Sequence, residues 1–246
     1  SQFTLIQNTE ATTSIWQETF EEDSATRDEW ENASTVEETK WSLLQKNHKI
    51  INKDVNRLVT LAPDDSSNGK LPDPAQGNYA YWYGNGVAGS FLNKEASLLT
   101  EEGQPVETRL NGGTSAKAYY GTLTSPVIDL STTQKPISLS FKTWWEIESV
   151  NPSSRGYDAM DVEVSVNGGE FKKLARLNPL SDPQTDYNRW SIPFSNFGFN
   201  LAPQFAQQEA ISLDEYAGQS NIKIRFKFDT VDQYYNAYRG WIIDDI

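Results

Sequence analysis

The last 26 residues, NIKIRFKFDTVDQYYNAYRGWIIDDI (221–246), decide how this chain is interpreted. From 222 to 229 apolar side chains alternate with charged ones, which predicts a strand with one buried and one solvent-facing side. A tyrosine-rich loop follows, and residues 240–246 predict a second strand. That closing strand places Asp244 and Asp245 among large apolar residues. Because a buried carboxylate without a partner is costly, both acids need a cation, hydrogen-bond donors or a solvent-facing position.

The same period of two recurs earlier in the chain. It is clearest at 137–145 (ISLSFKTWW) and at 161–166 (DVEVSV), and the second stretch runs into the tight-turn signal Asn167-Gly168-Gly169. Residues 15–22 and 78–84 predict two further strands. Since short strands follow one another with turn signals and without a strand–helix–strand rhythm, the sequence predicts an all-β, antiparallel two-sheet jelly-roll sandwich.

The length of 246 residues suits one large β domain, and we expect a single domain over residues 1–246. Residues 1–14 are polar and predict a linker or an edge strand. The region 31–75 is charged and less regular, so we expect a partly helical or irregular insertion there. Within it, residues 50–61 fit either a helix or strands, and the pattern does not choose between them.

Composition excludes several classes of function. The net charge of −13 argues against a nucleic-acid partner and against an anionic membrane surface. No apolar run approaches the roughly 18 residues needed for membrane insertion. The absence of cysteine excludes disulfides and thiolate metal sites, and the single histidine, His48, excludes zinc sites built on several histidines. We expect His48 on the surface.

Four signatures follow one another in a fixed order. They are Phe20-Glu21, then Gly121-x-Leu-x-Ser-Pro126-x-Ile-Asp-Leu130, then Asp161-Val-x-Val-Ser165 with Asn167-Gly168-Gly169, and finally Tyr216-Ala-Gly218 leading to Gly240-Trp-x-Ile-Asp-Asp-Ile246. This order resembles the MAM-like jelly-roll domains of bacterial secreted and surface proteins, as found in immune-inhibitor-A-type metallopeptidases and anchored surface proteins. The resemblance implies a secreted or cell-surface sandwich without catalytic residues, which serves as an adhesive, ligand-binding or domain-organising module.

The resemblance also implies a structural ion. Related calcium-bearing jelly rolls hold Ca²⁺ where the acid of the first strand meets the acids of the last. Carried over by position, this implies calcium ligands among Glu18, Glu21, Asp244 and Asp245. Calcium takes about six to eight oxygen ligands and would neutralise carboxylates gathered at a sheet end. The alternative is that these acids accept backbone hydrogen bonds.

A glycan is a reasonable ligand, because sugar faces stack on exposed flat rings beside polar groups. The candidate ligand-binding residues are the tryptophans of two predicted strands and the polar aromatic residues of the last loop: Trp82, Trp144, Tyr234, Tyr235, Tyr238 and Arg239. Each of the tryptophans could instead pack in the core. Trp144 and its neighbour Trp145 must point to opposite sides of their strand, so one of them faces away from the main core.

Three functions remain open. The first is a non-catalytic binding or adhesion module of a larger exported bacterial protein, which is stabilised by calcium, binds a glycan or a cell-surface protein and adjoins neighbouring domains. The second is a structural spacer that packs against a catalytic neighbour, which would expose a large apolar patch. The third is a carboxylate-based polysaccharide-degrading enzyme, which needs two carboxylates about 5–9.5 Å apart. With 34 acidic residues, the sequence cannot single out such a pair.

Overall fold

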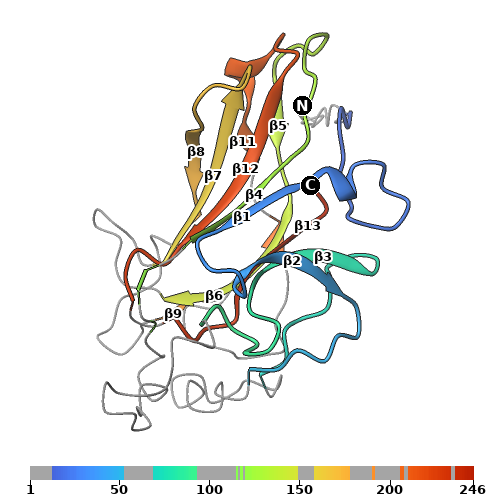
Figure 1. Cartoon of the computed structure of the whole chain (residues 1–246). Helices are drawn as coiled ribbons and strands as arrows, with labels where there is room; N and C mark the ends of the chain where they lie inside the picture. The colour runs from blue at the N-terminus through green and yellow to red at the C-terminus, as the bar shows by residue number, and fades with distance from the viewer. Residues whose placement is uncertain are drawn as a thin grey trace, which may run out of the picture.

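Two antiparallel sheets face each other in a computed structural model that describes residues 13–52, 69–92, 115, 117–118, 120–148, 158–177, 190–191, 206–207, 210–233 and 236–246 (Figure 1). The five-stranded sheet has the order β1 (Glu31–Ser34), β4 (Tyr120–Thr124), β12 (Ile222–Asp229), β7 (Ala159–Val166) and β8 (Lys172–Arg176). The six-stranded sheet has the order β10 (Ala206–Gln207), β6 (Lys142–Glu148), β13 (Gly240–Asp244), β3 (Tyr79–Gly84) and β2 (Lys40–Gln45), with β9 (Trp190–Ser191) paired to β6.

The remaining elements are small. Strands β5 (Ser138–Leu139) and β11 (Ile211–Ser212) form a two-stranded sheet, and two 3-10 turns occupy Arg27–Glu29 and Asp214–Tyr216. The chain crosses repeatedly between the two large sheets, which is the jelly-roll arrangement that the sequence predicts. No helix in the described ranges is long and apolar enough to cross a membrane.

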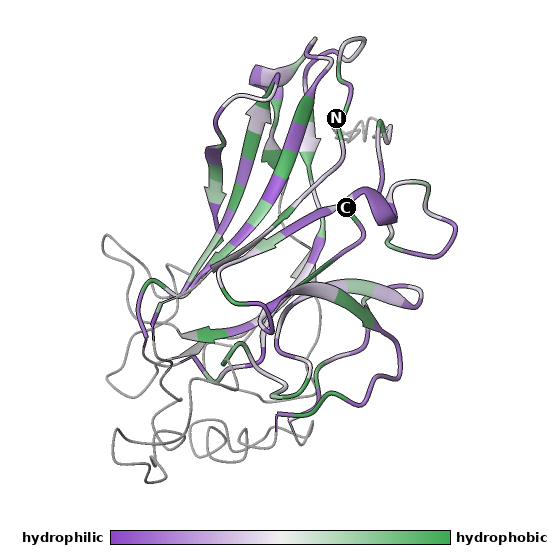
Figure 2. Cartoon of the chain, in the orientation of Figure 1, coloured by the Kyte–Doolittle hydropathy of each residue, from purple (hydrophilic) through white to green (hydrophobic). Residues whose placement is uncertain are grey.

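The two closing strands lie in different sheets and meet across the core. Along β12 the apolar residues are buried and the charged ones are partly exposed, an alternation visible as green and purple bands in Figure 2. Phe226 of β12 lies 5.8 Å, between ring centroids, from Trp241 of β13. Phe228 lies 4.7 Å from Tyr83 of β3. Large rings from both sheets therefore fill the space between them, and such rings bury much apolar surface.

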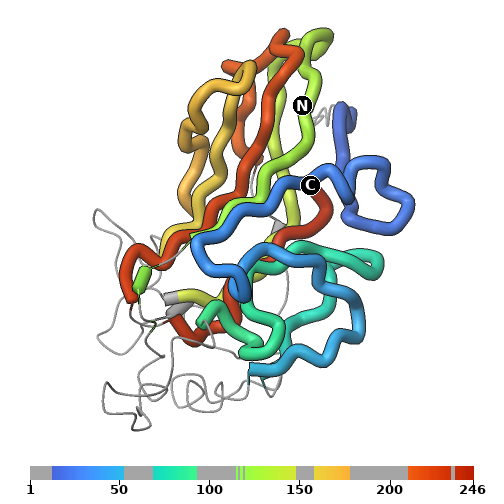
Figure 3. Tube along the Cα trace, in the orientation of Figure 1, coloured from blue at the N-terminus to red at the C-terminus, as the bar shows by residue number. Residues whose placement is uncertain are grey.

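The two ends of the described chain run side by side (Figure 3). Glu18 and Ile246 exchange both backbone hydrogen bonds, each with a donor–acceptor distance of 2.9 Å. The segment near residue 18 is thereby attached to the end of the last strand. Residues 1–12, most of the expected linker, lie outside the described residues.

The predicted insertion is wrong for residues 31–45. Strands β1 and β2 are regular members of the two sheets: β1 pairs with β4, and β2 pairs with β3 along its whole length. Both are edge strands, so fewer of their side chains are buried and their alternation in the sequence is weak. Residues 53–68 lie outside the described part of the chain.

Two described segments, 46–52 and 69–78, cover one side of the sandwich. Since Trp241 points into the core, its neighbour Ile242 points to the outer face of the six-stranded sheet. Ile242 stands opposite Trp82 on one side and Trp144 on the other, and all three are buried. Residues 46–52 and 69–78, here called the covering segment, lie against this face and contribute the buried Leu71. The outer face of the six-stranded sheet is therefore a second, smaller part of the core.

Candidate functional site

The carboxylate of Glu18 is buried and fully hydrogen-bonded. Its Oε1 accepts from the Phe20 backbone N–H at 2.7 Å and from Ser24 Oγ at 2.6 Å. Its Oε2 accepts from Thr26 Oγ1 at 2.6 Å and from Trp30 Nε1 at 3.1 Å. A carboxylate offers about four lone-pair directions, so these donors occupy all of them.

Glu21 binds the backbone at the start of β3. Its Oε1 accepts from the N–H groups of Asn78 at 2.6 Å and Tyr79 at 3.0 Å. Gly77, with φ +59°, lies so close that a Cβ there would stand 2.1 Å from this same oxygen. Glycine is required at residue 77 both for its left-handed backbone and for the approach of Glu21.

Asp244 and Asp245 differ in their surroundings. Asp244 is 1% exposed and accepts from the N–H groups of Gln76 at 3.1 Å and Asp245 at 2.8 Å. Burial raises its pKa to about 7, against the effect of these backbone donors. Asp245 is paired with Lys142 Nζ at 3.3 Å and accepts from Gln17 Nε2 at 3.3 Å.

The four acids predicted as calcium ligands therefore each have donors of their own, and among their hydrogen bonds only the one from Gln17 to Asp245 joins the two ends of the described chain. Within the described ranges, no three metal-ligating side chains come together into a group that could hold an ion. The alternative to a calcium site, that these acids accept hydrogen bonds, agrees with the contacts given above. Calcium stays a prediction, and an ion would have to replace some of these donors.

Four of the predicted ligand-binding residues are not at the surface. Trp82 and Trp144 lie on the outer face of the six-stranded sheet beneath the covering segment, and Tyr238 and Arg239 are buried beside them. For Trp82 and Trp144 the alternative of core packing holds, whereas the expectation of an exposed loop side chain is wrong for Tyr238 and Arg239, because the sequence does not show that a distant segment covers this face. Trp144 and Trp145 do point to opposite sides of β6, with Trp145 opposite the inward-facing Trp241. Tyr234 and Tyr235 lie outside the described residues.

Arg239 instead forms an ion pair inside the protein. Its Nε and Nη2 donate to Glu146 Oε2 at 2.8 and 2.6 Å, and its backbone N–H donates to Oε1 at 3.2 Å. Its Nη1 donates to the Lys70 carbonyl of the covering segment at 2.8 Å, and its guanidinium carbon lies 5.2 Å from the centroid of the Trp144 ring. This pair joins β6, β13 and the covering segment. Sequence reasoning missed Glu146, since nothing in the strand pattern distinguishes it from a solvent-facing acid.

His48 is also part of the covering segment. Its side chain is largely buried, with Nδ1 accepting from the Ile50 N–H at 3.2 Å and Nε2 3.3 Å from the Pro72 carbonyl. These contacts assign the neutral tautomer that carries its proton on Nε2. Burial is the main cause that lowers the pKa of His48. The expectation of a surface histidine is wrong.

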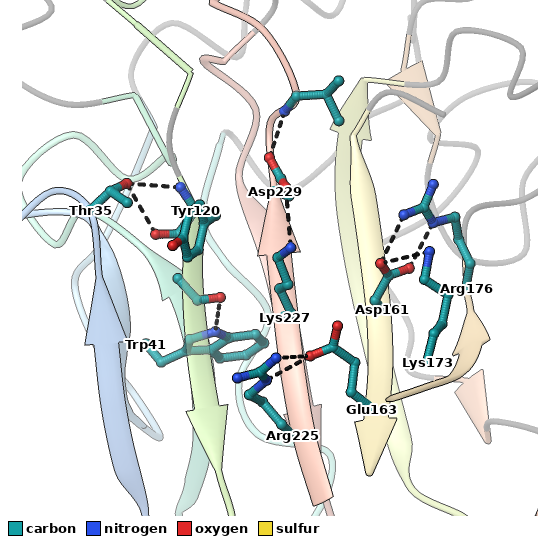
Figure 4. A network of polar contacts seen from close by, with 12 residues as sticks. Thr35, Trp41, Tyr120, Asp161, Glu163, Lys173, Arg176, Arg225, Lys227 and Asp229 are labelled. Atoms are coloured by element: carbon teal, nitrogen blue, oxygen red, sulfur yellow. Dashed lines mark hydrogen bonds and ion pairs between the residues drawn. The ribbon is translucent and has the colours of Figure 1, made fainter. Parts of the chain in front are cut away.

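The outer face of the five-stranded sheet is different in kind, because charged side chains line it and form a network (Figure 4), and most of them are at least partly exposed. Charge alternates across its strands, with mostly cations on β12, acids on β7 and cations on β8. We refer to it as the polar face and define it by these residues: Glu31, Tyr120, Asp161, Glu163, Lys173, Arg176, Lys223, Arg225, Lys227 and Asp229.

Ion pairs connect the strands of the polar face. Arg176 binds Asp161 through two parallel hydrogen bonds, Nε to Oδ1 at 2.7 Å and Nη2 to Oδ2 at 2.8 Å, and Lys173 Nζ lies 3.2 Å from Oδ2. Burial alone would raise the pKa of Asp161, but these two cations hold it below its usual value. Arg225 Nε donates to Glu163 Oε2 at 2.6 Å. The network joins β12, β7 and β8 through charged side chains as well as through backbone hydrogen bonds.

One aromatic ring stands at the edge of this network. Tyr120 is 44% exposed, and Lys227 Nζ lies 5.2 Å from the centroid of its ring. Lys227 also lies 3.5 Å from Asp229 Oδ2, while Asp229 Oδ1 accepts from the Val231 N–H at 2.9 Å. The sequence does not predict a site at Tyr120 or in this network. The alternating charged residues of 222–229 are the feature of the sequence that could have indicated it.

A scan against protein-family models found no match to this chain, and a search of curated proteins found none either. The MAM-like resemblance therefore rests on the four sequence signatures. What the fold and the contacts define is a class: an all-β sandwich with one outer face covered by its own chain and the other outer face lined by charged, mostly half-buried side chains.

Proposed function

We propose that this chain is a non-catalytic binding module of an exported protein, and that it binds a glycan on its polar face. The observation that carries the proposal is the difference between the two outer faces of the sandwich. The face of the six-stranded sheet is apolar and covered by residues 46–52 and 69–78. The polar face keeps an exposed ring, Tyr120, beside ordered charged side chains.

The energetics of the polar face support this role. The exposed pair of Lys223 and Glu31 contributes roughly 0–1 kcal/mol to stability, whereas the pairs of the buried Asp161 and Glu163 also help to hold β12, β7 and β8 together. Their value to a binding site lies in position, because side chains that are already ordered lose less entropy when a ligand binds. Donors and acceptors alternate from Glu31 to Arg176 across the strands, which suits sugar hydroxyls, since each hydroxyl both donates and accepts.

The test is binding to a glycan array, followed by calorimetry on the glycans that are retained. We expect Tyr120→Ala to weaken binding roughly tenfold, because stacking on an aromatic ring contributes about 0.5–1.5 kcal/mol beyond the burial of its surface. Leu43→Ala is the matched control, since Leu43 is a comparably exposed side chain on the edge strand of the other sheet. Equal affinity of Tyr120→Ala and the unaltered protein would remove the polar face as the site, and the failure of every glycan to bind would remove the function.

Calcium is a separate part of the proposal, and it rests on the acids near the seam of the two ends. Melting the protein with calcium and then with chelator tests it, because an ion that binds only the folded state must raise the midpoint. An unchanged midpoint would mean that the hydrogen bonds to Glu18, Glu21 and Asp244 stabilise the seam without an ion.

A further inference from the structure

The polar face gathers cations on an otherwise acidic protein. The chain carries a net charge of −13, with 21 basic residues against 34 acidic ones. The polar face reverses this balance with five cations and four acids, the cations being Lys173, Arg176, Lys223, Arg225 and Lys227. At physiological salt, charges more than about 8 Å away are largely screened, so a bound ligand experiences this local balance.

Around β7 the cations lie outside the acids that they pair with. Two of its acids lie underneath: the side chains of Asp161 and Glu163 are 5% and 10% exposed. The side chain of Lys173, which is paired with Asp161, is 47% exposed. Arg176 and Arg225 are intermediate. A ligand that approaches β7 and β8 therefore meets ammonium and guanidinium groups before it meets the carboxylates of Asp161 and Glu163.

These cations keep donors for a second partner. Arg225 directs Nε and Nη2 at one oxygen of Glu163, and in the described ranges its Nη1 has no hydrogen-bond partner. An arginine has five N–H donors and a lysine three. Lys173 and Lys227 each make one ion pair, so each retains N–H donors beyond that contact.

We infer that the ligand of the polar face is an acidic glycan, a polysaccharide that carries carboxylate or sulfate groups; this inference rests on the proposed function. Its acid groups would accept from Lys173, Arg225 and Lys227, where charge-assisted hydrogen bonds are about twice as strong as neutral ones. Its hydroxyls would donate to Asp229 and Glu31, the more exposed acids of the face. A neutral glycan leaves the cations without a matching charge.

Dextran and dextran sulfate provide a matched pair of probes, with polygalacturonate as a carboxylate polymer. We expect dextran sulfate and polygalacturonate to bind, dextran to bind far more weakly, and added salt to weaken the acidic polymers. The double variant Lys173→Gln/Lys227→Gln should lose at least about tenfold in affinity for them, since a hydrogen bond to a charged group contributes about 1.5–3 kcal/mol. Lys40→Gln/Lys46→Gln makes the same change in net charge at two exposed lysines, one in β2 and one just after it, away from the polar face, and should bind as the unaltered protein does. Equal melting midpoints of the two double variants would show that both are folded.

Several results would overturn the inference. Dextran binding as well as dextran sulfate would mean that charge does not select the ligand, although the glycan-binding role would stand. Equal losses in the two double variants would mean attraction to net charge without a site. Vesicles of anionic phospholipid that bind in place of both polymers, with the same dependence on Lys173 and Lys227, would identify a membrane surface as the partner. Failure of every polymer, neutral or acidic, would count against the proposed function itself.

Discussion

The buried ion pair between Arg239 and Glu146 gives the sharpest test of the structure. The two side chains are 0% and 1% exposed, and three hydrogen bonds run from Arg239 to the Glu146 carboxylate. Removing one partner of a buried pair leaves an uncompensated charge and costs about 3–5 kcal/mol. We expect Arg239→Met to lower the free energy of unfolding by this amount. For a chain of this size the midpoint would fall by roughly 6–20 °C.

The double variant Arg239→Met/Glu146→Leu separates the cost of the orphaned charge from the worth of the pair. Replacing both partners by apolar side chains of similar volume is often neutral. Here the backbone N–H of residue 239 and the Lys70 carbonyl would each lose a partner, and a buried unsatisfied group costs about 1–3 kcal/mol. We therefore expect the double variant to be less stable than the unaltered protein but more stable than either single variant.

Urea unfolding at neutral pH, analysed as a double-mutant cycle, measures these differences. Lys223→Met is the matched control, because Lys223 pairs with Glu31, whose side chain is 70% exposed, and it should cost about 1 kcal/mol or less. Two results would refute the reasoning: a cost of Arg239→Met no larger than that of Lys223→Met, or a double variant no more stable than the singles. Either would mean that this pair is not shielded from solvent by the covering segment.

Three further predictions concern stability. Gly77→Ala should cost about 1–3 kcal/mol in urea unfolding, because the added Cβ meets Glu21 and the backbone is left-handed, whereas Gly218→Ala, also left-handed but with open space around it, should cost less. The raised folded pKa of Asp244, about 7 against an ordinary 3.8, means that its carboxyl binds a proton more tightly in the folded state. The contribution of Asp244 to the free energy of unfolding is thus fully present below about pH 4 and is lost as pH rises through 7, by as much as about 4 kcal/mol. Asp244→Asn should lack this dependence of stability on pH in a series of melts. The same dependence in the variant and the unaltered protein would contradict the assignment. The pKa of His48 is lowered in the folded state, so its effect on stability runs the other way: its contribution is present above pH 6.5 and is lost on acidification. His48→Gln should therefore lose less stability than the unaltered protein between pH 6.5 and 5.

The strands with a buried and an exposed side could be predicted from the sequence because a period of two is a local property. The alternation of 222–229 predicts β12, and it predicts correctly which side of that strand is buried. The turn at Asn167-Gly168-Gly169 lies between β7 and β8 as expected. Edge strands β1 and β2 were missed for the same reason, since a strand with one neighbour buries too little to need a clear alternation.

The candidate sites depended on contacts between distant residues. Trp144 and Trp82 are of the residue type that stacks on sugars, and only the covering segment makes them core residues. In the sequence Arg239 looks like a solvent-facing cation of a loop, and only the folded chain places Glu146 beside it. In the opposite direction, Tyr120 belongs to a stretch that the sequence does not mark as a site, and it is the exposed ring of the polar face.

The sequence by itself determined the class of fold, the closing pair of strands and the need of Asp244 for partners, because hydrophobic periodicity and the cost of burying a charge act wherever the chain folds. Only the tertiary structure decided which outer face is covered and which is exposed. That choice depends on where residues 46–52 and 69–78 lie relative to strands far from them in the chain, and no local pattern of side chains carries that information.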